Sequence, residues 1–386
     1  MEVAVAAVVV EVVAVVAAHE ERVGEVVVKD RFGLGWRPEL ALDMLRHAGD
    51  VEILEFIAEE WFTAPPARLA TLTAWCRERP CHLHGTSLGL ASAVPVAQER
   101  LLAWKNLVHA TQPAFWSEHL AFVRGGGIEL GHLAAPPRTT ATIAGALANI
   151  QAMKNVVGSL PLLENVATLM VPPGSVIDEP TWLCGIIENS GAGMLLDLHN
   201  WHANAVNQGW DATAALDRLP LERVVAVHLA GGRRWRGRLL DDHLHPVPEA
   251  VFDLLEGVAA RVPGPLDVLI ERDGAFPAFA ELLDELAHAR ASVAAGRARR
   301  VAMAARTPAL RQATAVAVAS ETSGDKMEEF LARLYTDATL RTAFYADPHG
   351  CARAAGLPSA VGEQLHHLDR EGLILVADSL GAKRRR

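Results

Sequence analysis

The chain has 386 residues, of which 51% are apolar and 21% are charged, as is ordinary for a globular protein with one large domain and a smaller part. Its formal charge of −10 argues against a nucleic-acid-binding protein, which would normally present a basic face. The four cysteines show no C-x-x-C spacing, which favours a reducing compartment and argues against a disulfide framework or a zinc knuckle.

Residues 1–28 form an N-terminal extension. Its apolar stretch, residues 4–18, is too short to span a membrane and is interrupted by Glu11. It has no preceding basic region, so a secretory signal is not expected. We therefore expect a cytoplasmic protein with no membrane partner. The extension is either an upstream addition from a mis-chosen start or a helix packed outside the main domain.

From residue 29 to residue 295, short apolar runs alternate with longer amphipathic segments. The runs are typical of strands buried on both faces, and this alternation predicts a parallel sheet. Eight strand-helix units predict closure into a (β/α)8 TIM barrel, whereas no G-x-G-x-x-G supports an open doubly wound sheet. The expected strands are 26–36, 51–55, 81–84, 113–119, 161–165, 193–200, 224–231 and 266–273, and the expected helices are 38–47, 67–77, 97–109, 140–157, 180–189 and 248–262.

The composition changes after the barrel. Residues 296–326 are rich in Ala, Arg, Thr and Ser and are expected to form a linker, and helical periodicity returns in 327–386, which predicts a small all-helical domain. The basic run from Lys383 to Arg386 is expected to be a solvated tail. We expect this domain to recognise a partner or the substrate, with the linker letting it move. The alternative is an appendage that covers one face of the barrel.

Acidic residues and histidines stand where most of the strands end. The carboxyl ends of barrel strands open onto one face, so residues far apart in the chain should converge there. Glu55 is the last residue of one of the apolar runs, and we expect it either to support the metal ligands from outside or to contact the substrate. The nine expected metal ligands are His84, His119, Glu164, Asp197, His199, His228, Asp241, His243 and Glu271.

Nine ligands exceed the six or so positions around one octahedral ion. They predict at least two ions, bridged by a carboxylate such as Glu164. Imidazole mixed with carboxylate suits iron, manganese or zinc, and no cysteine stands among the nine ligands, which excludes an iron–sulfur cluster. If Asp197 and His199, and likewise Asp241 and His243, lie in extended segments, both members of each pair face one pocket. Such a centre serves hydrolysis or isomerisation, and iron could instead activate dioxygen.

Residues 33–273 resemble the multinuclear non-heme iron-dependent oxidative enzymes. The resemblance implies a xylose-isomerase-like barrel with two or three irons. It implies a dioxygen-using enzyme that modifies a ribosomally made peptide, most typically at cysteine, helped by a partner protein that captures the leader. The motifs that carry it are GLGWRPEL, LEFIAEEWF, LHGTSLGLAS, SEHLAF, LLENV, LLDLHNWHANAVNQG, VHLAGG, DDHLHPVP and LIERDGAFP.

The resemblance also implies residue roles. Glu164, Asp197 and His228 are expected to be catalytic, with Glu164 bridging two ions. Glu60 and His245 depart from the pattern of the family. His82 could face the barrel interior, but the resemblance favours His84 as the ligand. The residues expected to orient the metal ligands by hydrogen bonds are Asn165, Asn200, His202 and Asp273. Four tryptophans are expected either to line a peptide groove or to pack against helices: Trp36, Trp61, Trp116 and Trp201.

Two other functions remain open at this point. A divalent-metal sugar isomerase or phosphodiesterase could use the same barrel. Basic residues at the rim would support phosphate binding, and a loop after His228 carries Arg233, Arg234, Arg236 and Arg238. A non-catalytic scaffold is the third possibility, and the complete ligand set argues against it.

Overall fold

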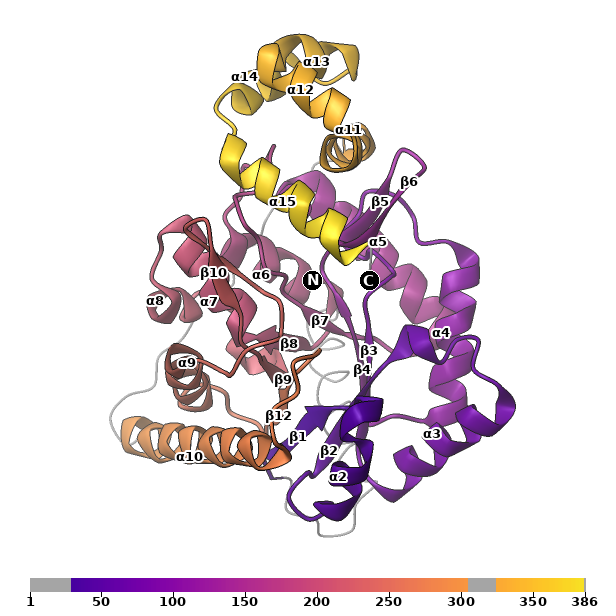
Figure 1. Cartoon of the computed structure of the whole chain (residues 1–386), viewed down its shortest axis with the longest axis vertical. Coiled ribbons are helices and arrows are strands. Elements are labelled where there is room, and N and C mark those ends of the chain that lie inside the picture. The colour runs from indigo at the N-terminus through magenta and orange to yellow at the C-terminus, as the bar shows by residue number, and fades with distance from the viewer. Residues whose placement is uncertain (1–28, 305–323, 385–386) are drawn as a thin grey trace, which may run out of the picture.

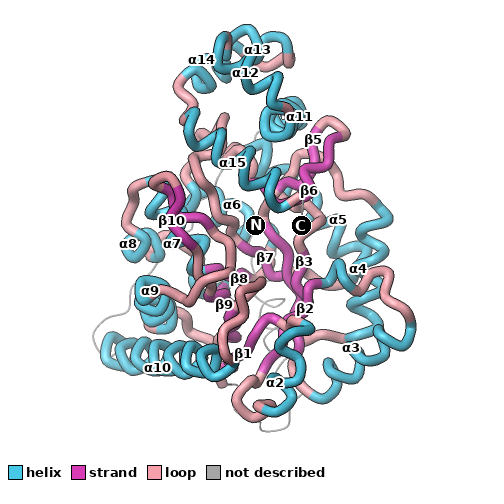
Figure 2. The backbone as a smooth tube through the Cα atoms, viewed as in Figure 1, coloured by secondary structure: helices cyan, strands magenta, loops and turns pink. Residues whose placement is uncertain are grey.

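Eight parallel strands close into a barrel in the computed structural model, which describes residues 29–304 and 324–384 (Figures 1 and 2). Neighbouring strands follow the order β1-β12-β9-β8-β7-β4-β3-β2. The predicted α/β barrel is therefore confirmed, while the N-terminal extension lies outside the described residues. The barrel strands are β1 (Arg31–Gly35), β2 (Ile53–Ile57), β3 (Cys81–Gly85), β4 (Phe115–His119), β7 (Leu162–Glu164), β8 (Met194–Asp197), β9 (Val224–Leu229) and β12 (Asp267–Ile270).

The register of the barrel brings the polar strand ends to one level. His119 on β4 pairs with Glu164 on β7, and Asp197 on β8 pairs with His228 on β9. Below this level β1 and β2 approach closely at Gly33, where a Cβ atom would lie only 1.8 Å from the carbonyl oxygen of Ile53. Glycine is therefore required at this position, and the GLGW motif reflects barrel closure.

Helices cover the outside of the barrel as expected from the apolar periodicity. Within α5 a capping box between Thr139 and Thr142 satisfies the first backbone amides. Helix α10 continues to Ala304, so the expected border at residue 295 falls inside a helix. The helices are α2 (Ala41–Arg46), α3 (Pro66–Glu78), α4 (Gln98–Thr111), α5 (Thr140–Val157), α6 (Glu179–Ser190), α7 (Leu198–Gln208), α8 (Ala212–Leu216), α9 (Glu249–Ala259) and α10 (Phe279–Ala304).

Two hairpins that the periodicity did not predict rise from the mouth of the barrel. One consists of β5 (Phe122–Gly125) and β6 (Ile128–Ala134), and the other of β10 (Arg233–Trp235) and β11 (Arg238–Leu240). Both are short insertions after barrel strands, where loops commonly build the site of a TIM-barrel enzyme. They form walls around the polar strand ends.

The C-terminal region is helical, as predicted, but its apolar core is shared with the barrel. Phe122 and Leu130 of the first hairpin, together with Met170, pack in one cluster with Phe330 and Leu380. Figure 1 accordingly shows α11 and α15 lying beside β5 and β6, with α12, α13 and α14 farther out. These helices are α11 (Gly324–Thr336), α12 (Ala338–Ala346), α13 (Pro348–Ala354), α14 (Ser359–His366) and α15 (Arg370–Lys383).

Polar contacts add to this docking. Buried Glu328 accepts hydrogen bonds from the Ser92 hydroxyl at 2.5 Å and from the Ala93 amide at 2.7 Å. Arg384 donates to the Glu129 carbonyl, and Lys383 lines a cavity, so these two residues do not belong to a solvated tail as expected. Among the described residues no helix combines the length and the hydropathy that a membrane span requires.

Candidate metal centre

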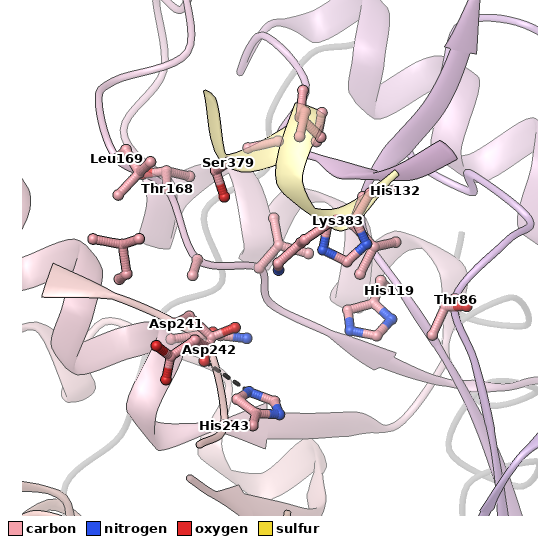
Figure 3. A pocket seen from close by; sticks show the side chains of 18 of the residues that line it. Thr86, His119, His132, Thr168, Leu169, Asp241, Asp242, His243, Ser379 and Lys383 are labelled. Atoms are coloured by element: carbon pink, nitrogen blue, oxygen red, sulfur yellow. Dashed lines mark ion pairs between the residues drawn. The ribbon is translucent and has the colours of Figure 1, made fainter. Parts of the chain in front are cut away.

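A cavity of ≈ 360 Å³ lies over the carboxyl ends of the barrel strands. Its floor includes His84, His119, Asp241, His243 and Glu271, and Figure 3 shows His119, Asp241 and His243 around it. Its walls come from the first hairpin, from residues 166–172 and from β11, and its roof comes from the helical domain. The volume lies at the lower end of the range for small-molecule sites and suits one amino-acid side chain with adjoining backbone.

Six of the nine predicted ligands converge around Glu164 and His228. Glu164 Oε2 lies 3.2 Å from His84 Nε2 and 3.1 Å from His119 Nε2. His228 Nδ1 lies 3.2 Å from Glu164 Oε1 and 3.1 Å from Glu271 Oε2. Asp197 belongs to the same group, since it offers an oxygen within 4.8 Å of ligand atoms of Glu164, His228 and Glu271. All of these side chains are buried.

The other three predicted ligands form a neighbouring group. Asp241 Oδ1 lies 3.0 Å from His199 Nδ1 and 2.7 Å from His243 Nε2. His243 Nδ1 in turn lies 3.6 Å from Glu271 Oε2, so Glu271 stands between the two groups. The nine residues are thus brought together as two adjoining sets of side chains.

The expected extended geometry of the two D-x-H pairs is wrong. Asp197 caps α7 by accepting a hydrogen bond from the Asn200 amide, so the chain turns helical at Leu198 and His199 lies in the helix. His243 adopts a left-handed backbone with φ of 56°, which is unusual outside glycine. The His199 ring also packs directly on Gly232, where a Cβ atom would lie 2.7 Å from it. Helix capping therefore sets the direction of the His199 side chain, and the loop conformation sets that of His243.

Protein groups fix the orientation of the imidazoles. His119 Nδ1 donates to the Gly85 carbonyl at 2.8 Å, and His84 Nδ1 is hydrogen-bonded to the Ser117 hydroxyl at 2.7 Å. Because a carbonyl only accepts, the Nε2 atom of neutral His119 carries a lone pair. Both Nε2 atoms face Glu164. Ligating histidines are commonly held through their other nitrogen in this way.

The arrangement places the lone pair of His119 against an oxygen of Glu164. Burial lowers the pKa of His84, and it lowers the pKa of His119 to about 4, so both rings are neutral near pH 7. His119 Nε2, which carries the lone pair, and His84 Nε2 both face Glu164 Oε2, a buried oxygen without a hydrogen bond among the described residues. A cation would satisfy all three atoms, since two ligand atoms about 2.1 Å from one ion at right angles are about 3 Å apart.

The other buried carboxylate and imidazole groups of the centre are also suited to bind cations. Burial, together with Glu164 and Asp241, raises the pKa of Asp197 well above its usual value, and Asp197 Oδ2 has no hydrogen bond. Among the described residues His199 Nε2 likewise lacks a hydrogen bond. Buried polar atoms are rarely left unpaired without a reason. The donor set of imidazole and carboxylate suits iron, manganese or zinc.

Glu55 lies below the ligands. Strand β2 continues to Ile57, so Glu55 is not at the strand end as expected, and its Oε2 accepts from His228 Nε2 at 3.0 Å. Although burial opposes it, the carboxylates of Glu271, Glu55 and Glu164 raise the pKa of His228 well above its usual value. His82 does face the interior, one level lower, with Nε2 3.0 Å from Asp267 Oδ2. Period-two alternation from His84 predicts this placement.

Several outer residues orient the centre. Asn165 bonds both the amide and the carbonyl of Asp197, and Asn200 bonds the Asn165 carbonyl. Asp273 forms ion pairs with Arg37 and His243, the latter at 3.4 Å. His202 is half-buried and does not line the cavity. The sequence alone did not point to Ser117 or to the Gly85 carbonyl, because only strand register shows that they lie beside His84 and His119.

Several residues that the sequence singled out lie away from the cavity. Glu60 is exposed and pairs with Arg68 at 3.4 Å, and His245 pairs with Asp242 at 2.9 Å. The four tryptophans do not line the cavity, and Trp61, Trp116 and Trp201 are buried in the main core. The packing alternative therefore holds for these three. None of Arg233, Arg234, Arg236 and Arg238 lines the cavity, and Arg238 is paired with Asp369 of the helical domain at 2.5 Å.

Comparisons with known proteins assign the barrel to a family. Residues 31–294 match the model of the RiPP precursor modification enzyme MbnB/TglH/ChrH. A UPF0276 protein of Bordetella parapertussis is 38% identical over 272 residues, which cover 69% of this chain and 93% of that protein. A UPF0276 protein of Streptomyces avermitilis is 36% identical over 263 residues, which cover 66% of this chain and only 53% of that protein's length.

Solved structures are similar at the level of the fold. A xylose isomerase domain protein of Alicyclobacillus acidocaldarius has a TM-score of 0.46 and 16% identity, with 69% of this chain and 99% of that chain covered. The 3-keto-D-glucoside 4-epimerase YcjR of E. coli has a TM-score of 0.45 and 15% identity, with 68% and 100% covered.

Proposed function

The chain belongs to the MbnB/TglH/ChrH family of RiPP precursor modification enzymes, and on that premise we propose that it is an iron-dependent, dioxygen-using oxidoreductase that modifies a ribosomally made peptide at cysteine. The proposed metal ligands are the nine converging residues, with Glu164 between two ions. Glu164, Asp197 and His228 are the proposed catalytic residues. We further propose that it acts in the reducing cytoplasm, which the absence of C-x-x-C spacing among its four cysteines favours.

One observation carries the metal-dependent part of this proposal. The neutral imidazoles of His84 and His119 turn their Nε2 atoms to the same oxygen of Glu164, and a cation would resolve the repulsion between that oxygen and the lone pair of His119. Bound iron would supply one-electron redox chemistry toward dioxygen. The second set, His199, Asp241 and His243, adjoins the first through Glu271, which supports more than one ion.

The chain's own residues would position the substrate and exclude water. The cavity admits a side chain and adjoining backbone but not a folded leader, so leader recognition must lie elsewhere. We therefore retain the proposal of a leader-binding partner protein. Ser117 and the Gly85 carbonyl would keep the rings of His84 and His119 in place while the substrate enters and leaves.

The test is to reconstitute the full chain with ferrous iron without oxygen and to add it to short cysteine-bearing precursor peptides encoded beside its gene. A change in peptide mass at cysteine that requires both iron and dioxygen is the expected result, and Glu164→Ala should abolish it. An unchanged peptide mass in every such reaction, or turnover supported equally well by zinc without dioxygen, would refute the proposal.

A further inference from the structure

One face of α15 looks into the cavity above the metal centre. Val376, Ser379, Leu380 and Lys383 all line it, at the i, i+3, i+4, i+7 spacing of a single helix face. Figure 3 shows Ser379 and Lys383 on this helix, with Lys383 beside His132. Tyr335 of α11 lines the same cavity. The family match ends at residue 294, so this roof comes from a part of the chain that the match does not include.

The roof is held in place by contacts made elsewhere. Leu380 packs in the cluster that also contains Phe122, Leu130 and Met170 from the barrel's own loops. At the start of α15, Asp369 pairs with Arg238 at 2.5 Å, and just beyond its end Arg384 donates to the Glu129 carbonyl. The helix is therefore anchored at both ends across the barrel mouth, and its cavity-facing side chains have defined positions relative to the metal centre.

Lys383 brings a positive charge to the cavity. Of the described residues, one arginine and one lysine line the cavity, and the arginine, Arg37, is paired with Asp273. Within the part of the chain that the structure describes, Lys383 has neither a hydrogen bond nor an ion pair. Burial and the nearby Lys383 lower the pKa of His132 to about 3, so that ring is neutral. The ammonium is thus a single localised charge at the upper end of the cavity.

We propose that Lys383, presented by α15 with Ser379 beside it, binds a carboxylate of the peptide substrate next to the residue that is modified. A half-buried ammonium is less screened than an exposed one and binds a carboxylate as a point charge. The helical domain thereby completes the substrate pocket. The carboxylate is either the C-terminus of the peptide or an Asp or Glu side chain, since both present the same group. This inference rests on the proposed function for the identity of the substrate.

The experiment measures binding without turnover. The full-length, metal-loaded chain is titrated without oxygen with N-acetylcysteine and with N-acetylcysteine amide, which differ only in the carboxylate. The wild-type chain should prefer the acid about tenfold, as for a charge-assisted contact. Lys383→Met keeps the aliphatic stem, so it should fold normally and bind the two probes equally. Lys326→Met is the matched control, because Lys326 is exposed on the same domain and does not line the cavity, and it should keep the preference.

A third probe separates the two sources of the carboxylate. N-acetyl-Cys-Asp amide carries a side-chain carboxylate and no C-terminal one, and stronger binding of either acid supports the site and identifies its source. Equal binding of all three probes by the wild-type chain, or a preference for an acid that survives in Lys383→Met, would overturn the proposal. Binding preferences are measured without dioxygen, so a failure of peptide oxidation would refute the proposed function and leave this result standing.

Discussion

Nε2 of His228 donates to Oε2 of Glu55 at 3.0 Å, while the opposite side of the same ring faces Glu164 and Glu271. Below Glu55 the polar side chains continue through His82, whose Nε2 lies 3.0 Å from Asp267, to Arg31, which donates twice to Asp267 at 2.6 Å. A row of buried polar groups therefore supports the centre from within the barrel. Glu55 is its point of contact with a proposed ligand.

Replacement Glu55→Gln should weaken metal binding and leave the fold intact. The amide keeps the size of the side chain but removes the charge that holds His228, and loss of such a supporting group typically costs 10- to 100-fold in metal affinity. Competition with a coloured chelator would measure the change. Exposed Glu60→Gln serves as the control, and equal affinities in the two variants would contradict the positioning role.

Replacement Glu164→Ala should remove activity and most of the bound metal. A carboxylate that contacts two ions leaves both sites incomplete when it is lost, whereas the apolar core below the mouth does not depend on it. Elemental analysis together with circular dichroism would show metal loss with a native spectrum. Wild-type turnover at full metal occupancy would disprove the assignment.

Replacement His199→Ala should remove about one ion and leave the other in place. His199 belongs to the set with Asp241 and His243, apart from the ligands around Glu164. We expect the wild-type chain to hold at least two irons, because the ligand set exceeds the positions on one ion. The iron content per chain, measured for the wild type and for His199→Ala, tests both expectations. A well-occupied wild-type preparation with one zinc and no iron would disprove this expectation.

The docking of the helical domain should weaken as the pH rises. Burial raises the pKa of Glu328 from 4.5 to about 7, so the folded chain keeps a proton that the unfolded chain releases. The free energy of unfolding should therefore fall between pH 4.5 and about 7. Thermal midpoints across this range should fall less for Glu328→Gln than for the wild type or for exposed Glu329→Gln. Identical pH profiles would show that Glu328 does not contribute.

Local patterns in the sequence predicted the barrel and the order of the candidate ligands. Short apolar runs that end in His, Asp or Glu are visible without a structure, because strand burial leaves a continuous signal. The same alternation placed His82 and His84 on one face. The hairpins β5–β6 and β10–β11 escaped prediction, since they are short and packed by tertiary contacts.

The sequence by itself determined which chemical groups reach the mouth of the barrel, since that depends on residue type and position along each strand. Only the tertiary structure decided how these groups divide into two sets and which groups support the proposed ligands. It also decided that Lys383 lines the cavity and does not belong to a solvated tail. Those relationships join residues that are tens to hundreds of positions apart. They depend on strand register, helix capping and a core shared by two regions, none of which leaves a local pattern.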